Sequence, residues 1–186
     1  MQILSKVQVD SSGRHMPDLE LYQDHFEAQA EVDASPAAVF DLIADHSRLS
    51  AHMTEPSWMM AESRMSSDLD EKQGRAVGSK ITLRGTVLGL PLKVEEIVTD
   101  YAPPYTKSWK TIGSPRLLVI GAYCMGFSLA RRQGGSLLRV FINYSPRDEG
   151  VARLLGQVFG RSYAKWCVNR MVRDAVAHFH THQGHL

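Results

Sequence analysis

The stretch EVDASPAAVFDLIADHSRL, residues 31–49, decides how the chain begins to fold. In residues 26–32, which lead into it, apolar and polar residues alternate, and this period predicts a strand with one buried face. Ser35 is suited to the N-cap of a helix and Pro36 to its first turn. Apolar residues at helical spacing follow. We therefore expect a strand that passes directly into a short helix, and then a second short helix that ends near Met53.

The same stretch carries acids and histidines that raise the question of a reaction centre. Asp41, Asp45 and His52 are possible metal ligands or an acid and base pair. A metal site needs converging ligands supported by further polar groups, and the sequence shows no such set. Polar helix faces normally point to water, so we expect these acids and His46 to form the solvated side of the helix.

The chain end HFHTHQGHL contains further histidines, His178, His180, His182 and His185. Histidine-rich tracts can bind metal, and His178 and His182 lie one helical turn apart. Because this tract lies at a chain end, where order is usually lowest, we predict no metal site there or elsewhere. We also predict no cofactor.

Composition narrows the class of protein. The chain has 186 residues, enough for one domain with its own core, and its formal net charge is only +1. A charge so close to zero gives no basic field for nucleic acid. The two cysteines, Cys124 and Cys167, lie in apolar surroundings and fit no zinc spacing, which favours free thiols in a reducing compartment. The N-terminus lacks the pattern of a secretory signal. We expect a cytoplasmic protein.

The remaining elements are predicted from the spacing of apolar residues and from the glycines and prolines that interrupt it. Residues 58–145 alternate in apolar character between breaks that include Gly89-Leu90-Pro91, Ala102-Pro103-Pro104 and Gly113-Ser114-Pro115, and this predicts an antiparallel sheet. From Gly150 to about His182 there is no proline and apolar residues recur at helical spacing, which predicts one long helix. Residues 1–23 read as an arm, with a short strand at most, before a domain over 24–186.

This order resembles the helix-grip fold of the START-like, Bet v 1-like superfamily, which includes bacterial polyketide cyclase/dehydrase and lipid-transport proteins. The resemblance rests on three segments: VDASPAAVFDLIADHSRL, VEEIVTDYAPPYTKSW and YCMGFSLARRQGGSLLRV. It implies an α+β fold in which a curved antiparallel sheet of about six or seven strands wraps around the long C-terminal helix. Two short helices after the first strand would close one end. It also implies an internal cavity.

The side chains expected to line that cavity come from alternate strand positions and from the last helix. They are Leu83, Val94, Glu96, Trp109, Tyr123, Met125, Phe127, Val140, Ile142, Val168, Met171 and Val172. Tyr144, Arg84 and Asn143 are further polar-tipped candidates.

Glu96 is the one candidate for an acid or base. If the valines of residues 92–98 point inward, Glu96 enters the cavity, and burial would raise its pKa. The other register turns Ile97 inward and leaves Glu95 and Glu96 near solvent. Because buried carboxylates without partners are rare, we favour a structural role for both glutamates.

Three functions agree with these features. The favoured one is binding of a hydrophobic small molecule, lipid-like or polycyclic, in the cavity. The alternative is an enzyme of the polyketide cyclase/aromatase kind that uses the same cavity. The third is a quinone or lipid chaperone at a membrane. The basic last helix is compatible with transient contact with a membrane surface, although we favour an ordinary solvated helix face. Motifs of hydrolases, NTPases and dinucleotide-binding proteins (HExxH, GxSxG, Walker A, GxGxxG) do not occur. Ligand identity and oligomeric state stay open.

Overall fold

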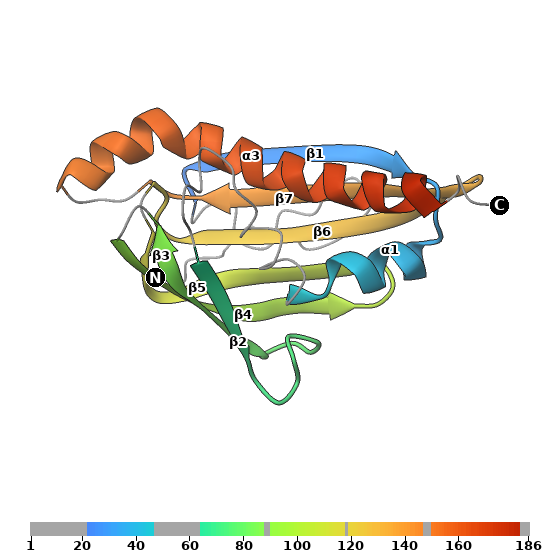
Figure 1. Ribbon diagram of the computed structural model, residues 1–186, viewed down its shortest axis with the longest axis horizontal. Coiled ribbons are helices and arrows are strands. Elements are labelled where there is room, and N and C mark those ends of the chain that lie inside the picture. The colour runs from blue at the N-terminus through green and yellow to red at the C-terminus, as the bar shows by residue number, and fades with distance from the viewer. Residues whose placement is uncertain (1–21, 47–63, 88–89, 118, 147–149, 183–186) are drawn as a thin grey trace, which may run out of the picture.

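The computed structural model describes residues 22–46, 64–87, 90–117, 119–146 and 150–182 (Figure 1). Their order confirms the expected succession of strand, helix, strands and long helix. The elements are β1 (Asp24–Val32), α1 (Pro36–Ile43), β2 (Arg64–Leu69), β3 (Lys80–Val87), β4 (Leu90–Ala102), β5 (Thr106–Arg116), β6 (Tyr123–Arg132), β7 (Gly135–Tyr144) and α3 (Gly150–His182). The predicted second short helix and the predicted N-terminal arm fall mainly on residues outside these ranges.

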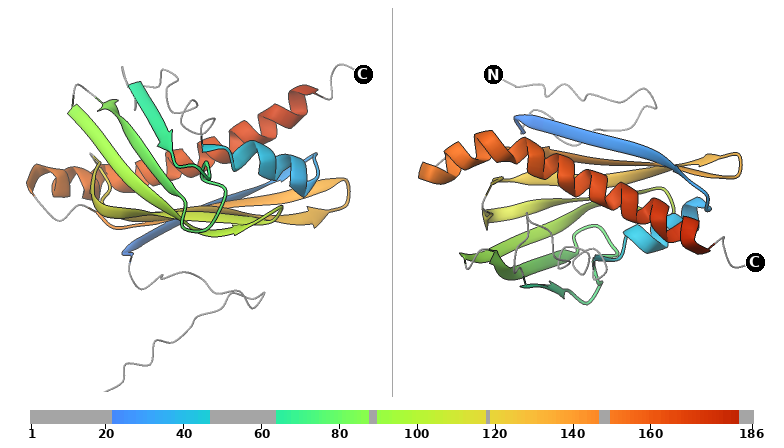
Figure 2. Two further views of the ribbon diagram at one scale, coloured as in Figure 1. Left: turned by 90° about the horizontal axis from the view of Figure 1, so that it is seen from below. Right: turned by 45° about the horizontal axis from the view of Figure 1, so that its top comes forward.

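The strands form one antiparallel sheet of seven strands, in the order β1-β7-β6-β5-β4-β3-β2. Successive strands from β2 to β7 pair as neighbours, and β1 pairs with β7. Both helices lie on the concave side of the sheet, which curls up at its β2–β4 end (Figure 2, left). α3 runs obliquely across the strands, packs on β1 and β7, and contacts α1 (Figure 2, right). This is the α+β helix-grip architecture. We call the face of the sheet that the helices cover the inner face.

Local sequence explains why α1 starts and stops where it does. The Ser35 hydroxyl accepts a hydrogen bond from the Ala38 amide at 3.3 Å, and Pro36 occupies the first turn. The helix buries Val39, Phe40 and Ile43 against the sheet side of the molecule. It therefore anchors the chain between β1 and the rest of the sheet.

Replacing Ser35 by Ala should lower the free energy of unfolding by about 1 kcal/mol, because the first turn of α1 loses its side-chain acceptor. Urea denaturation of the wild type and the variant measures this difference. Ser35→Asp, which restores an acceptor, is the control and should recover most of the loss. Equal midpoints for Ser35→Ala and the wild type would contradict the capping role.

The core lies between the inner face and the helices. The alternate apolar residues of β6 and β7 that were expected to point inward are all buried: Tyr123, Met125, Phe127, Leu129, Leu138, Val140, Ile142 and Tyr144. α3 contributes a stripe at helical spacing: Ala164, Val168, Met171, Val172 and Ala175. These side chains form a single hydrophobic cluster.

A register shift in β4 sets which side chains reach the inner face. Val94, Glu96 and Val98 are buried, so alternation up to Val98 follows the valine register. The pairing with β5 then slips by one residue between Val98 and Asp100. Since one extra residue reverses the alternation, Tyr101 also reaches the inner face, where its ring meets Phe40 edge to face.

One predicted break is wrong. Gly113-Ser114-Pro115 lies inside β5, where an irregular pairing with β4 and a positive φ of 67° at Gly113 absorb the disturbance. The break predicted at Gly89-Leu90-Pro91 does separate two strands, because β3 ends at Val87, β4 begins at Leu90 and these two residues pair. Leu90 and Pro91 themselves belong to β4, so the break lies slightly earlier in the chain than expected.

Candidate functional site

The residues predicted to line a cavity lie together on the inner face and on α3. The apolar members belong to the core cluster, with Leu83 partly buried at its edge. Glu96 is buried among them. The sequence therefore placed these side chains on the correct face, and their contact with a ligand stays a prediction.

Glu96 is inward, as the valine register predicts, and only 2% exposed. Tyr123 of β6 donates a hydrogen bond from its hydroxyl to Oε1. Burial raises the pKa of Glu96 to about 7, although Tyr123, the charge of Lys107 and the Trp109 ring nitrogen act to lower it. Among the described residues Oε2 has no hydrogen-bond partner. At neutral pH the side chain of Glu96 is therefore present both as the neutral acid and as the carboxylate.

Lys107 of β5 is a buried ionisable side chain that the sequence analysis did not single out. It is 0% exposed. Its Nζ donates to the Ala44 carbonyl at 2.6 Å and to His46 Nδ1 at 2.8 Å, and it lies 5.7 Å from the centre of the Tyr101 ring. Ala44 is the C-cap of α1, where the helix dipole favours a cation.

Influences of both signs act on the pKa of Lys107. Burial, followed by the positive charge of Arg75, lowers its pKa to about 8, while Asp45 and Glu96 act in the opposite sense. A signal for this side chain was present in the sequence. Lys107 stands two residues before Trp109, which was expected to point inward, so strand alternation puts both on the same face.

His46 is buried, which corrects the expectation that it belongs to the solvated side of the helix. It is only 3% exposed. Burial, and then the charge of Lys107, lowers its pKa to about 3, so the ring is neutral. The ring packs edge to face on Trp109, with centres 4.8 Å apart. A Cβ built on Gly74 would lie 3.5 Å from His46 Nδ1, so the β2–β3 loop closes over the ring.

A second polar pair lies on the α3 side. Tyr163 is hydrogen-bonded to Cys167, and burial raises the pKa of both, that of Cys167 to about 12. The thiol is therefore un-ionised at neutral pH and a poor nucleophile. The charge of Glu96 also raises the pKa of Tyr163. Polar groups thus extend across the molecule from α1, past Trp109 and Glu96, to α3.

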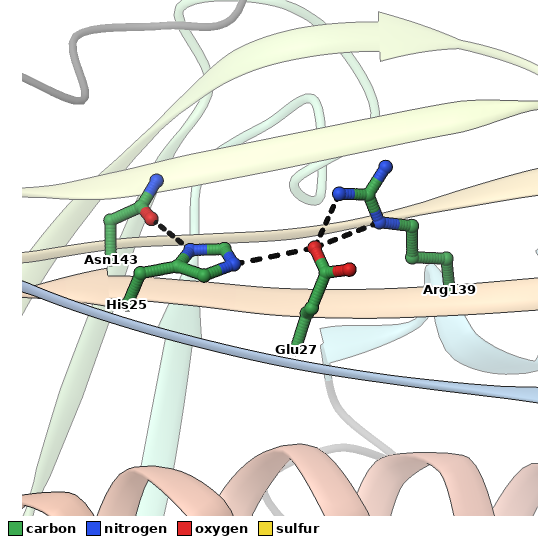
Figure 3. A network of polar contacts seen from close by, with 4 residues as sticks. All are labelled: His25, Glu27, Arg139 and Asn143. Atoms are coloured by element: carbon green, nitrogen blue, oxygen red, sulfur yellow. Dashed lines mark hydrogen bonds and ion pairs between the residues drawn. The ribbon is translucent and has the colours of Figure 1, made fainter. Parts of the chain in front are cut away.

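The other predicted polar candidates lie elsewhere or act as core. Asn143 is buried, yet its Oδ1 faces His25 Nδ1 at 2.5 Å on the opposite face of the sheet. Figure 3 shows it in a row with His25, Glu27 and Arg139 along β1 and β7. Arg84 is exposed. Asn143 and Arg84 are therefore wrong as inner-face candidates, because each points away from the helices.

Only some of the possible metal ligands lie within the described residues. Asp41 is exposed and Asp45 half-buried, and His52 lies outside the described residues. His180 is near Asp33 at 3.7 Å, as an exposed pair. Within the described ranges, no group of three or more His, Cys, Asp or Glu side chains is arranged to hold a metal ion. Over the same described ranges, none of the helices is both long enough and apolar enough to cross a membrane.

No protein-family model and no curated protein matches this chain. Solved structures do. A point mutant of norcoclaurine synthase from Thalictrum flavumn, in complex with a transition state analogue, matches with a TM-score of 0.58, 13% identity, and coverage of 86% of this chain and 96% of that one. Ara h 8.0201 matches with a TM-score of 0.55, 15% identity, and coverage of 83% and 98%.

The di-domain ARO/CYC StfQ from the steffimycin biosynthetic pathway matches with a TM-score of 0.58 and 11% identity. The match covers 86% of this chain and 52% of that one. At such low identity these likenesses speak to the fold alone. They confirm the fold that the resemblance drawn from the sequence implies: the chain has the α+β helix-grip fold.

Proposed function

We propose that this chain binds a largely apolar small molecule between the inner face of the sheet and α3. The observation that carries the proposal is the burial of Glu96 and Lys107 on a largely apolar inner face, with His46 buried beside Lys107. Stability alone does not call for ionisable side chains in a core, because burying them costs free energy. Apolar surface with a few polar groups is the usual composition of a ligand site.

The fold neighbours support this by analogy. The norcoclaurine synthase structure is a complex with a transition state analogue, so one chain of this fold binds a small molecule. Fold alone does not transfer a ligand or a reaction. The proposal for this chain therefore rests on its own inner face.

Native mass spectrometry of the purified protein tests the proposal, with titration of the dye ANS as a second measurement. We expect a co-purified mass or saturable dye binding. Val168→Phe, which fills space under α3, should reduce both, whereas Lys165→Phe on the exposed side of α3 should not. Circular dichroism checks that each variant is folded. The absence of bound mass and of saturable dye binding in the wild type would refute the proposal.

A second candidate function, a cyclase of the polyketide type, is favoured by one observation. Glu96 is buried, accepts from Tyr123, and has a pKa raised to about 7, the property expected of a group that transfers protons near neutral pH. The test is conversion of a synthetic poly-β-ketone thioester, followed by aromatic absorbance. Activity in the wild type that falls about 100-fold or more in Glu96→Gln supports the enzyme. Binding without conversion leaves the binding function alone.

A further inference from the structure

The buried Lys107 ammonium lacks a carboxylate partner at close range. Among the described residues, no Asp or Glu oxygen lies within 4.0 Å of its Nζ. Its two hydrogen-bond acceptors, the Ala44 carbonyl and His46 Nδ1, are both neutral. An ammonium has three N–H donors, so one remains. The charge of a buried cation is normally balanced by an anion in contact with it, whereas Asp45 and Glu96 act on Lys107 only from a greater distance.

His46 supplies a second donor beside it. Because Nδ1 accepts from Lys107, the ring proton of the neutral imidazole is on Nε2. Within the described part of the chain this buried Nε2 has no hydrogen-bond partner. A buried donor without an acceptor costs free energy, which an incoming acceptor would recover.

Aromatic rings surround this pair of donors. The Trp109 ring packs on His46, and the Tyr101 ring lies beside the Lys107 ammonium. Tyr101 in turn contacts Phe40 of α1. The site thus offers one positive charge and two donors next to continuous apolar surface, a combination that suits a molecule with a single anionic end.

We propose that Lys107 and His46 bind the carboxylate of an amphipathic monocarboxylic acid, whose apolar part lies over Trp109 and the inner face. The inference rests on the proposed binding function and specifies its ligand class. One carboxylate matches the charge and the two donors, whereas a doubly charged phosphate would bring more charge and more acceptors than Lys107 and His46 balance. The positive charge of Arg75 adds to the field at this site, and the charges of Asp45 and Glu96 oppose it.

The rival explanation is that Lys107 only fastens α1 to the sheet. Both explanations keep the bond from Lys107 to the Ala44 carbonyl. They differ in whether an acid binds more tightly than an uncharged molecule of the same length, and that difference can be measured.

Isothermal titration with decanoate and with decanol separates the two explanations. At pH 7 the wild type should bind decanoate about ten- to one-hundredfold more tightly than decanol, the range expected for charge-assisted hydrogen bonds. Lys107→Met should abolish this preference by weakening decanoate binding far more than decanol binding. Lys110→Met, on the other face of β5, is the matched control and should keep the preference.

A pH series tests the same point without relying on a Lys107 variant. From pH 7 to pH 10 decanoate keeps its charge, while Lys107 loses its own, so the preference should fall. The charged and titratable groups facing Lys107 are His46, Asp45, Glu96, Tyr101 and Arg75. Glu96 ionises near the start of this range, so the series is repeated in Glu96→Gln, where the fall should remain.

The outcomes are distinguishable. Equal affinity for decanoate and decanol in the wild type, or a preference that survives in Lys107→Met, would overturn the carboxylate site and leave the binding function standing. Failure of both probes to bind would overturn the site, and with the dye and mass measurements it would count against the binding function as well.

Discussion

Phe127→Ala is expected to lower the free energy of unfolding by about 3–5 kcal/mol, the usual cost of removing a large buried ring. Phe127 is 1% exposed and lies at the centre of the inner face. It faces Val140 of β7 in register, and its ring packs edge to face on Phe40 of α1 at 5.4 Å. The variant therefore loses contacts to β7 and to α1 at once, and leaves a cavity that these elements cannot close by a small movement.

Urea denaturation with intrinsic fluorescence and circular dichroism measures this loss. Phe159→Ala is the matched control, because Phe159 is 47% exposed on α3 and should cost less than about 1 kcal/mol. A loss below about 1 kcal/mol for Phe127→Ala would show that the packing of the inner face against α1 is much looser than the structure has it.

Glu96→Gln is expected to change how stability depends on pH. The folded-state pKa of Glu96, about 7, lies above its ordinary value of 4.5, so the folded protein holds this proton more tightly than the unfolded chain does. The resulting stabilisation is fully present below pH 4.5 and is lost as the pH rises through 7. Over that window the wild type should lose about 3 kcal/mol from this group, and Glu96→Gln should not.

His46 acts in the opposite sense. Its folded-state pKa of about 3 lies below the ordinary 6.5, so its contribution to stability rises with pH between those values. The two trends oppose each other between pH 4.5 and 6.5 and flatten the wild-type curve. Subtracting the wild-type curve from that of Glu96→Gln removes the His46 term and isolates Glu96.

Urea denaturation at half-unit steps from pH 4.5 to 7.5 gives both curves. The variant should gain stability relative to the wild type as the pH rises. Glu95→Gln is the control: Glu95 lies on the outer side of β4, paired with Lys93 at 2.7 Å, and its pKa is lowered rather than raised. Its curve should run parallel to that of the wild type in this range. Parallel curves for Glu96→Gln would mean that Glu96 is not buried as described.

Most elements of the fold could be predicted from the local sequence. The predicted long helix agrees with α3, because a stripe of apolar residues over many turns without proline is a strong signal. The passage from β1 into α1 followed from Ser35 and Pro36. The breaks predicted at Gly113-Ser114-Pro115 failed, since pairing with β4 holds the strand together across an irregularity.

The polar interior was predicted less well, for a physical reason. Glu96 could be placed by alternation, although its burial was thought the less favoured outcome. The burial of Lys107 and His46 depends on a contact between residues 61 positions apart, and on the Ala44 carbonyl, which any residue type would supply. A composition rule that puts lysine and histidine at the surface cannot anticipate such a partner.

The pairing of β1 with β7 also fixes the order in which the interior can assemble. Strands β2 to β7 are joined to their neighbours by short links, whereas β1 finds its partner across more than one hundred residues, as from Phe26 to Ile142. Closing so long a loop costs chain entropy before the contacts between β1 and β7 can offset that cost. We therefore expect the consecutive hairpins to form more readily than the pairing of β1. Because α1 follows β1 directly in the chain, we expect the Ala44 carbonyl to reach Lys107 only after β1 has paired with β7, so that the lysine stays hydrated until then.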